Sequence, residues 1–95
     1  MVTYKAPRRD FRFAYHELFN AEDISAIEAY SEVTPELIDA ILEAGAKLCE
    51  NELFPINRSG DEEGCQFHNG DVKTPAGFQA AYDAYVTGSW GGLSC

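Results

Sequence analysis

The sequence predicts a mainly α fold, a small helical domain of three to four helices with one short β-hairpin. A length of 95 residues allows one small domain, and 45% hydrophobic against 24% charged residues is a globular composition. Apolar residues recur at helical spacing in three segments bounded by capping residues, proline or glycine. A chain of this size buries roughly 60 to 65% of its unfolded surface, so we expect a second polypeptide surface to complete the core.

The first predicted helix covers residues 10–20. Asp10 is a favourable N-cap residue, and Phe11, Tyr15 and Leu18 recur at helical spacing. A weaker segment follows over residues 22–30, where the pattern fits either a short helix or a loop.

The strongest helix is predicted over residues 35–53. Thr34 can cap its free N–H groups, and Pro35 suits the first helical position because proline lacks one of those donors. Pro55 is expected to stop the run, and the polar stretch 57–64 to form a turn. The apolar positions of this helix are Leu37, Ile38, Ile41, Leu42, Leu48, Cys49 and Leu53.

The hairpin is predicted over residues 65–73. Its turn is the pair Asn69-Gly70, because both central residues of a type I′ turn need positive φ. Thr74-Pro75 then repeats the cap-plus-proline start and predicts a helix over 75–87. The tail 88–95 is expected to be a truncated connection, with no secondary structure after it to cover Trp90, and residues 1–95 to form a single partial domain.

The chain is acidic, with a formal net charge of −9, which opposes binding to the phosphate backbone of nucleic acids. Four of its seven bases lie in or next to a basic N-terminal arm, residues 1–9, and are Lys5, Arg8, Arg9 and Arg12. This arm either folds back on the acidic body or is solvated. The sequence shows no secretory signal and no apolar run that could span a membrane, which predicts a cytoplasmic protein.

A zinc site is the first chemistry to test. Cys65 and His68 have a C-x-x-H spacing, but tetrahedral zinc needs three or four protein ligands. Cys49, His16 and Cys95 are the remaining candidates, and they form no second closely spaced pair. The three cysteines also cannot all pair within one chain, which favours a reducing compartment. We therefore predict no metal site.

The sequence supports calcium binding and catalysis no better than it supports a zinc site. Ser59, Asp61, Glu63 and Gly64 approximate positions 1, 3, 5 and 6 of an EF-hand loop, but position 12, which must supply a bidentate carboxylate, is Gly70. Neither histidine lies in a nucleophile signature, and the paired carboxylates lie in segments expected to be solvated. The sequence predicts no catalytic and no cofactor-binding residue.

Several segments, taken together, resemble the start of bacterial acyl-CoA dehydrogenases, in the branch with a helical extension before the usual N-terminal domain. They follow in order along nearly the whole chain. They are Tyr4-Lys5-Ala6-Pro7-Arg8-Arg9-Asp10, Arg12-Phe13, His16-Glu17, Thr34-Pro35-Glu36-Leu37, Pro55-Ile56-Asn57-Arg58-Ser59-Gly60-Asp61, Gly64-Cys65, Thr74-Pro75-Ala76-Gly77-Phe78, Ala81-Tyr82, Tyr85 and Gly88-Ser89-Trp90-Gly91-Gly92-Leu93.

The resemblance implies an FAD-dependent family. Its enzymes desaturate an acyl-CoA thioester, with a glutamate that removes the α proton, and pass electrons to an electron-transfer flavoprotein. The chain resembles only the first helical piece, so no flavin contact and no catalytic glutamate carries over to it. FAD is expected for the full-length family and no cofactor for this chain.

Two main interpretations remain, beside a third, a small metal-dependent enzyme, which the scattered metal ligands disfavour. In the first, the chain is the N-terminal helical portion of a dehydrogenase and packs on the rest of that enzyme without being catalytic by itself. In the second, it is a stand-alone helical module that associates with itself or another polypeptide. A homo-oligomer is expected because uncovered apolar surface drives association, with Tyr82, Tyr85 and Trp90 as contact residues.

Overall fold

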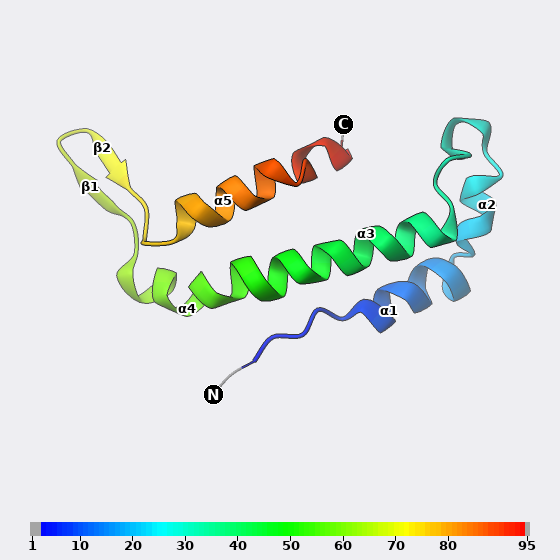
Figure 1. Ribbon diagram of the computed structural model, residues 1–95, viewed down its shortest axis with the longest axis horizontal. Coiled ribbons are helices and arrows are strands. Elements are labelled where there is room, and N and C mark those ends of the chain that lie inside the picture. Colours follow the sequence, from blue (N-terminus) through cyan, green and yellow to red (C-terminus); the bar gives the residue numbers. More distant parts are fainter. Residues whose placement is uncertain (1–2, 95) are drawn as a thin grey trace. The chain divides into compact units, whose positions relative to one another are not determined.

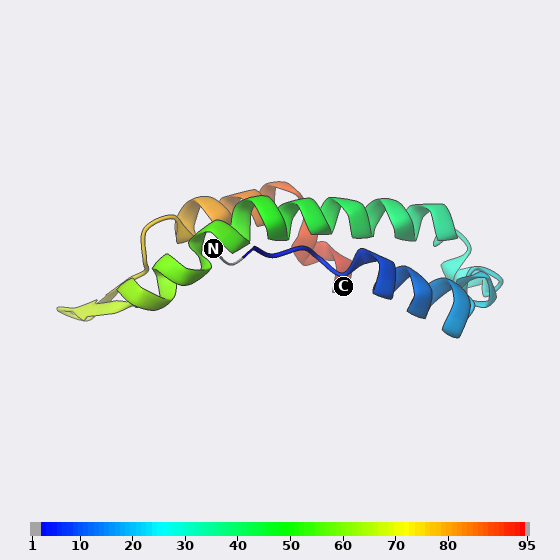
Figure 2. The ribbon, with the colours of Figure 1, turned by 90° about the horizontal axis from the view of Figure 1, so that it is seen from below.

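The computed structural model describes residues 3–94 (Figures 1 and 2), and this part of the chain divides into two units between Lys47 and Leu48. Most of the described chain is helical, and its two strands form one antiparallel hairpin. The predicted mainly α fold with a short hairpin is therefore confirmed. Each unit is treated separately below.

The first unit opens with α1 (Arg8–Arg12), followed directly by a π-helix (Phe13–Leu18). Together they occupy the predicted helix 10–20 but begin two residues earlier. Pro7, and not Asp10, is the N-cap, and its carbonyl accepts a hydrogen bond from the Phe11 N–H at 3.1 Å. Proline is well suited to the start of a helix because it has no backbone N–H that needs a hydrogen-bond partner there.

The weaker segment 22–30 is helical in two short pieces, α2 (Ala21–Ser25) and a 3₁₀-helix (Glu28–Tyr30). Its N-cap is Asn20, with a positive φ of 51°. Ser25 Oγ donates a hydrogen bond to the Val33 carbonyl across the two pieces. This bond fixes the return of the chain toward the next helix.

The helix α3 (Pro35–Leu48) begins where the sequence predicts. The Thr34 Oγ1 atom accepts a hydrogen bond from the Leu37 N–H at 3.1 Å, which satisfies one of the free donors of the first turn. Ile38 and Ala46 are the buried residues of this helix. Figures 1 and 2 both show α1 beside the first half of α3.

The cap gives a direct stability prediction. Replacing Thr34 by alanine removes the acceptor for the Leu37 N–H and should lower the free energy of unfolding by about 1 kcal/mol. Urea unfolding followed by circular dichroism measures the loss. The matched control is Thr74→Ala, since the dipeptide Thr74-Pro75 has the same sequence but does not begin a helix. Equal losses in the two variants would contradict the cap assignment.

The second unit begins at Leu48 and continues through a π-helix (Cys49–Leu53) into α4 (Phe54–Glu63). The predicted stop at Pro55 and the predicted turn over 57–64 are therefore wrong. Pro55 lies in the first turn of α4, where its missing N–H costs least. The polar residues that follow are helical, and an ion pair joins Arg58 to Glu62 one turn later at 3.0 Å.

The hairpin is confirmed, with β1 (Gln66–His68) antiparallel to β2 (Asp71–Lys73) and Phe67 opposite Val72. Its turn residues have positive φ, 50° at Asn69 and 86° at Gly70, as a type I′ turn requires. All residues of both strands are exposed.

The helix α5 (Phe78–Thr87) begins three residues later than predicted, with Gly77 as its N-cap. Pro75 belongs to the preceding turn, in which its carbonyl accepts a hydrogen bond from the Phe78 N–H at 3.3 Å. The predicted end at Gly88 is confirmed.

Within the tail, residues 90–94 form a 3₁₀-helix (Trp90–Ser94). Ser89 has a positive φ of 60°, and its carbonyl accepts a hydrogen bond from the Gly92 N–H at 3.2 Å. This local bond turns the chain without a regular α-helix. Cys95 lies outside the described residues, as do the first two residues of the basic arm.

Few apolar side chains are buried over residues 3–94. The buried hydrophobic residues in this range are Ala21, Ile38, Ala46 and Ala81, three of which are alanines. Most of the large apolar side chains remain exposed, from 39% at Leu53 to 74% at Phe67. Most of the large apolar side chains over residues 3–94 are therefore only partly covered.

Candidate functional site

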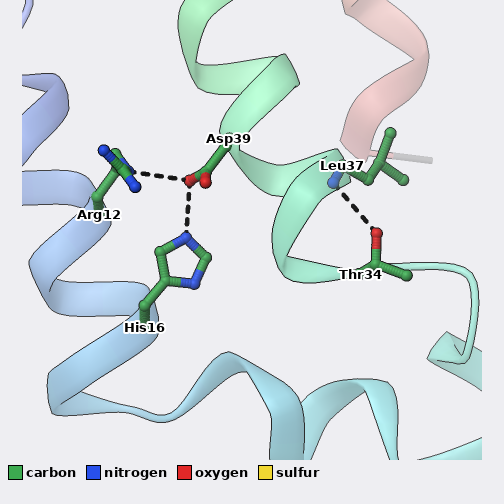
Figure 3. A network of polar contacts seen from close by, with 5 residues as sticks. All are labelled: Arg12, His16, Thr34, Leu37 and Asp39. Atoms are coloured by element: carbon green, nitrogen blue, oxygen red, sulfur yellow. Dashed lines mark hydrogen bonds and ion pairs between the residues drawn. The ribbon is translucent and has the colours of Figure 1, made fainter.

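A polar cluster joins α1 and its π-helix to α3 (Figure 3). The Asp39 Oδ1 atom lies 2.7 Å from His16 Nε2 and accepts a hydrogen bond from Arg12 Nε at 3.2 Å. Arg12 and His16 are four residues apart and therefore reach the carboxylate from one side of their helical segment. The His16 side chain is 20% exposed and that of Asp39 is 37% exposed.

The cluster perturbs Asp39. The hydrogen bond from His16 is the largest effect and holds the pKa of the Asp39 carboxyl below its ordinary value of 3.8. The Arg12 guanidinium acts in the same direction, while partial desolvation opposes both. The carboxylate is thereby kept ionised, and Arg12, which follows the basic arm, pairs with it.

The chemistry of this cluster is that of a connection between helices. A catalytic triad also contains an imidazole beside a carboxylate, but it needs a hydroxyl or thiol nucleophile as third member. Here the third group is a guanidinium, which carries charge and donates hydrogen bonds but performs no nucleophilic attack. The arrangement therefore orients α1 against α3.

An open groove of about 740 Å³ lies next to the cluster. Residues 6–10 and Arg12 form one wall, and Asp39, Leu42 and Glu43 form the other. A flavin needs an apolar slot for its ring and donors for its pyrophosphate, whereas this groove is open and places carboxylates among its arginines. The groove does not fit FAD, and no flavin chemistry is assigned to it.

The metal candidates are dispersed within the described residues. Cys65 precedes β1 and is exposed, Cys49 is half-buried in a helix, and His68 ends β1 opposite Asp71. Over residues 3–94, no three histidine, cysteine or acidic side chains gather in a metal-binding group. Cys95 is not among these residues.

The acidic stretch considered for calcium is helical. Ser59, Asp61 and Glu63 lie in α4, so their carboxylates and hydroxyl do not surround a common point as loop ligands do. Glu63 instead accepts a hydrogen bond from the Ala76 N–H at 2.5 Å. This bond connects the end of α4 to the segment before α5.

The predicted contact residues lie on and just after α5. Tyr82 is 62% exposed and Tyr85 is 39% exposed, while Trp90 is half-buried. The Trp90 ring folds over Gly88, since a Cβ atom placed on that glycine would lie 2.6 Å from Trp90 Nε1. The structure thus leaves the tyrosines open, and the interface itself remains a prediction.

A second exposed surface was not foreseen. Phe11, Tyr15 and Leu18, whose spacing predicts a helix, are 47%, 42% and 63% exposed. The sequence contains a signal for two different sides, because Arg12 and His16 form a polar pair at the same spacing, but it does not indicate which side faces α3. That pair faces α3, so the aromatic residues are turned outward.

Along residues 3–94, the structure has no helix that is both long and apolar enough to cross a membrane. No protein-family model matches the chain.

Two curated proteins are similar to nearly all or most of the chain. A 3-methylmercaptopropionyl-CoA dehydrogenase of Ruegeria pomeroyi is 37% identical over 93 residues, which is 98% of this chain and 16% of that protein. A butyryl-CoA dehydrogenase of Syntrophomonas wolfei is 33% identical over 84 residues, 84% of this chain and 14% of that protein. The chain therefore spans only a small part of the length of these relatives.

Proposed function

Because the chain belongs to the acyl-CoA dehydrogenase family as a segment matching a small part of its relatives, we propose that it is the N-terminal helical portion of an FAD-dependent acyl-CoA dehydrogenase. Its role is structural. It packs on the remainder of the dehydrogenase, and the flavin contacts and the catalytic base belong to that remainder.

The match over 98% of the chain carries this proposal. The uncovered apolar surface supports it, because a segment that packs on further polypeptide must present such surface. The Asp39 cluster supports a positioning role, since it orients helices and contains no nucleophile. The proposal extends to a cytoplasmic location and, for the whole enzyme, to electron transfer to an electron-transfer flavoprotein.

The test compares the complete reading frame that contains this segment with a version lacking residues 1–95. We expect the complete protein to be yellow and to oxidise an acyl-CoA. The deletion should lower its thermal stability more than its flavin content per folded molecule. A complete protein that binds no flavin would overturn the proposal.

The isolated chain gives a separate prediction. Purified residues 1–95 should be colourless and should not reduce an artificial electron acceptor with any acyl-CoA, because the groove beside Asp39 does not fit a flavin. Absorbance near the flavin band and acceptor reduction measure the two properties. A yellow preparation that retains flavin after gel filtration would contradict the assignment of the chemistry to the remainder.

A second candidate function is a helical module that associates with itself. The exposure of Tyr82 and Tyr85 on α5 favours it, because adjacent exposed aromatic residues are typical of contact surfaces. Sedimentation of the isolated chain tests it, and a monomer at high concentration would count against it.

A further inference from the structure

The β-hairpin is the least covered element of the second unit. All six residues of its two strands, Gln66–His68 and Asp71–Lys73, are exposed. Figures 1 and 2 both show the hairpin extending beyond α4 and α5. An isolated two-stranded hairpin is marginally stable at best in water, and a further element normally covers one of its faces. Within residues 48–94 the structure places no such cover on it.

One face of the hairpin is apolar. Phe67 lies directly opposite Val72, so their side chains share a face. The residues on either side of them in the two strands are polar and point to the other face. Phe67 is 74% exposed and Val72 is 65% exposed. The hairpin therefore has a polar face suited to water and an apolar face that its own unit leaves open.

The length of the relatives favours the rest of the polypeptide as the covering surface. The chain matches 16% of one acyl-CoA dehydrogenase and 14% of the other, so most of each polypeptide lies outside the matched segment. Under the proposed function, that remainder is joined covalently to this chain and is present at a high effective concentration. A linked surface therefore meets the hairpin more readily than a second molecule does.

The charge around the hairpin disfavours a second copy of it as the partner. Residues 61–73, which include the end of α4 and the whole hairpin, contain four acids and one base, a net charge of −3. Two copies that met at their hairpins would bring these like charges together, which weakens binding. The complementary surface is apolar at its centre, where it receives Phe67 and Val72, and basic at its rim.

We propose that the Phe67/Val72 face of the hairpin docks in an apolar, basic-rimmed depression on the remainder of the dehydrogenase polypeptide. The Phe67 ring enters the depression, and Val72 supports it from the opposite strand. This inference rests on the proposed function and deepens it by naming the surface through which the second unit is attached.

A photo-crosslinking phenylalanine analogue at position 67 of the complete protein tests what occupies this face. Irradiation should join position 67 to a peptide outside residues 1–95, which mass spectrometry of the digest identifies. The same analogue in place of Gln66, on the polar face, is the matched control and should cross-link less. A cross-link that lies within residues 1–95, of the same or of another copy, would overturn the proposal, as would equal cross-linking from both positions.

Tryptic cleavage after Lys73 measures how firmly the hairpin is held, because cleavage requires the hairpin to open. In the complete protein, Phe67→Ser should raise the cleavage rate about 30-fold, as for the loss of an aromatic contact residue. Loss of the cross-strand pair with Val72 alone accounts for about fivefold at most. Phe67→Leu should keep most of the protection, and Gln66→Ser on the polar face is the matched control.

The outcomes separate this proposal from the proposed function. A complete protein that binds flavin, but in which Phe67→Ser raises cleavage no more than fivefold, overturns the docking of the hairpin alone. A complete protein that binds no flavin, but in which position 67 cross-links to the remainder, overturns the proposed function and supports the docking.

Discussion

Gly77→Ala is expected to lower the free energy of unfolding of the second unit by about 3 kcal/mol, from backbone strain and a steric clash together. Gly77 has a φ of 90°, which an L-residue with a Cβ atom rarely adopts. A Cβ atom there would also lie 2.8 Å from the Cγ2 atom of Ile56. Ile56 is branched at Cβ, so its Cγ2 methyl cannot move away by a cheap rotation.

The matched control is Gly70→Ala in the hairpin turn. Gly70 has a similar φ of 86°, but a Cβ atom there would meet nothing within 4 Å. This control should lose only the cost of the left-handed backbone, about 1 to 2 kcal/mol. Urea unfolding of both variants measures the difference, which isolates the contact with Ile56. Equal losses would show that Gly77 does not bring the start of α5 against α4.

Local chemistry made some elements predictable. The start of α3 follows from Thr34 and Pro35 because the cap bond and the proline act within one turn. The hairpin turn follows from Asn69 and Gly70, since few residue pairs accept two positive φ values. Both features depend on neighbours in the sequence and on nothing more distant.

Proline was the main source of error because its meaning depends on context. Pro55 fits either the end of one helix or the first turn of the next, and the structure uses it in the first turn of α4. Pro75 shows the reverse case, in which a cap-plus-proline pair lies in a turn and α5 begins only at Phe78. The left-handed backbone at Gly77 places the start of α5 at Phe78. The residue types around Pro75 do not reveal this backbone conformation.

The Asp39 cluster was beyond sequence reasoning for a different reason. Asp39 is 23 residues from His16 and 27 from Arg12, so no local pattern joins them. Helical spacing identified the two sides of the segment 10–20 but not which side faces the chain. In the structure Asp39 on α3 contacts the polar side of this segment, and Phe11 and Tyr15 are exposed.

The Asp39 cluster predicts a loss of order at low pH. The pKa of Asp39 in the folded chain is lowered, so its ionised form contributes stability that is fully present above the ordinary pKa of 3.8. That contribution disappears as the pH falls through the lowered pKa. Amide hydrogen exchange should therefore show α1 and the π-helix losing protection below about pH 4, and Asp39→Ala should show reduced protection at neutral pH already.

Single substitutions rank the partners of Asp39. His16→Ala should move the pKa of Asp39 back toward 3.8 by more than Arg12→Ala does, because the His16 hydrogen bond is the largest cause of the shift. Carbon-detected NMR titration of the Asp39 carboxyl measures both changes. For the hydrogen-exchange experiment, Glu43→Gln is the matched control for Asp39→Ala, since Glu43 lies on the same helix and pairs only loosely with Lys47 at 3.8 Å. If the control loosens residues 8–18 as much as Asp39→Ala does, the general charge of α3 holds this segment, and the specific contacts of Asp39 do not.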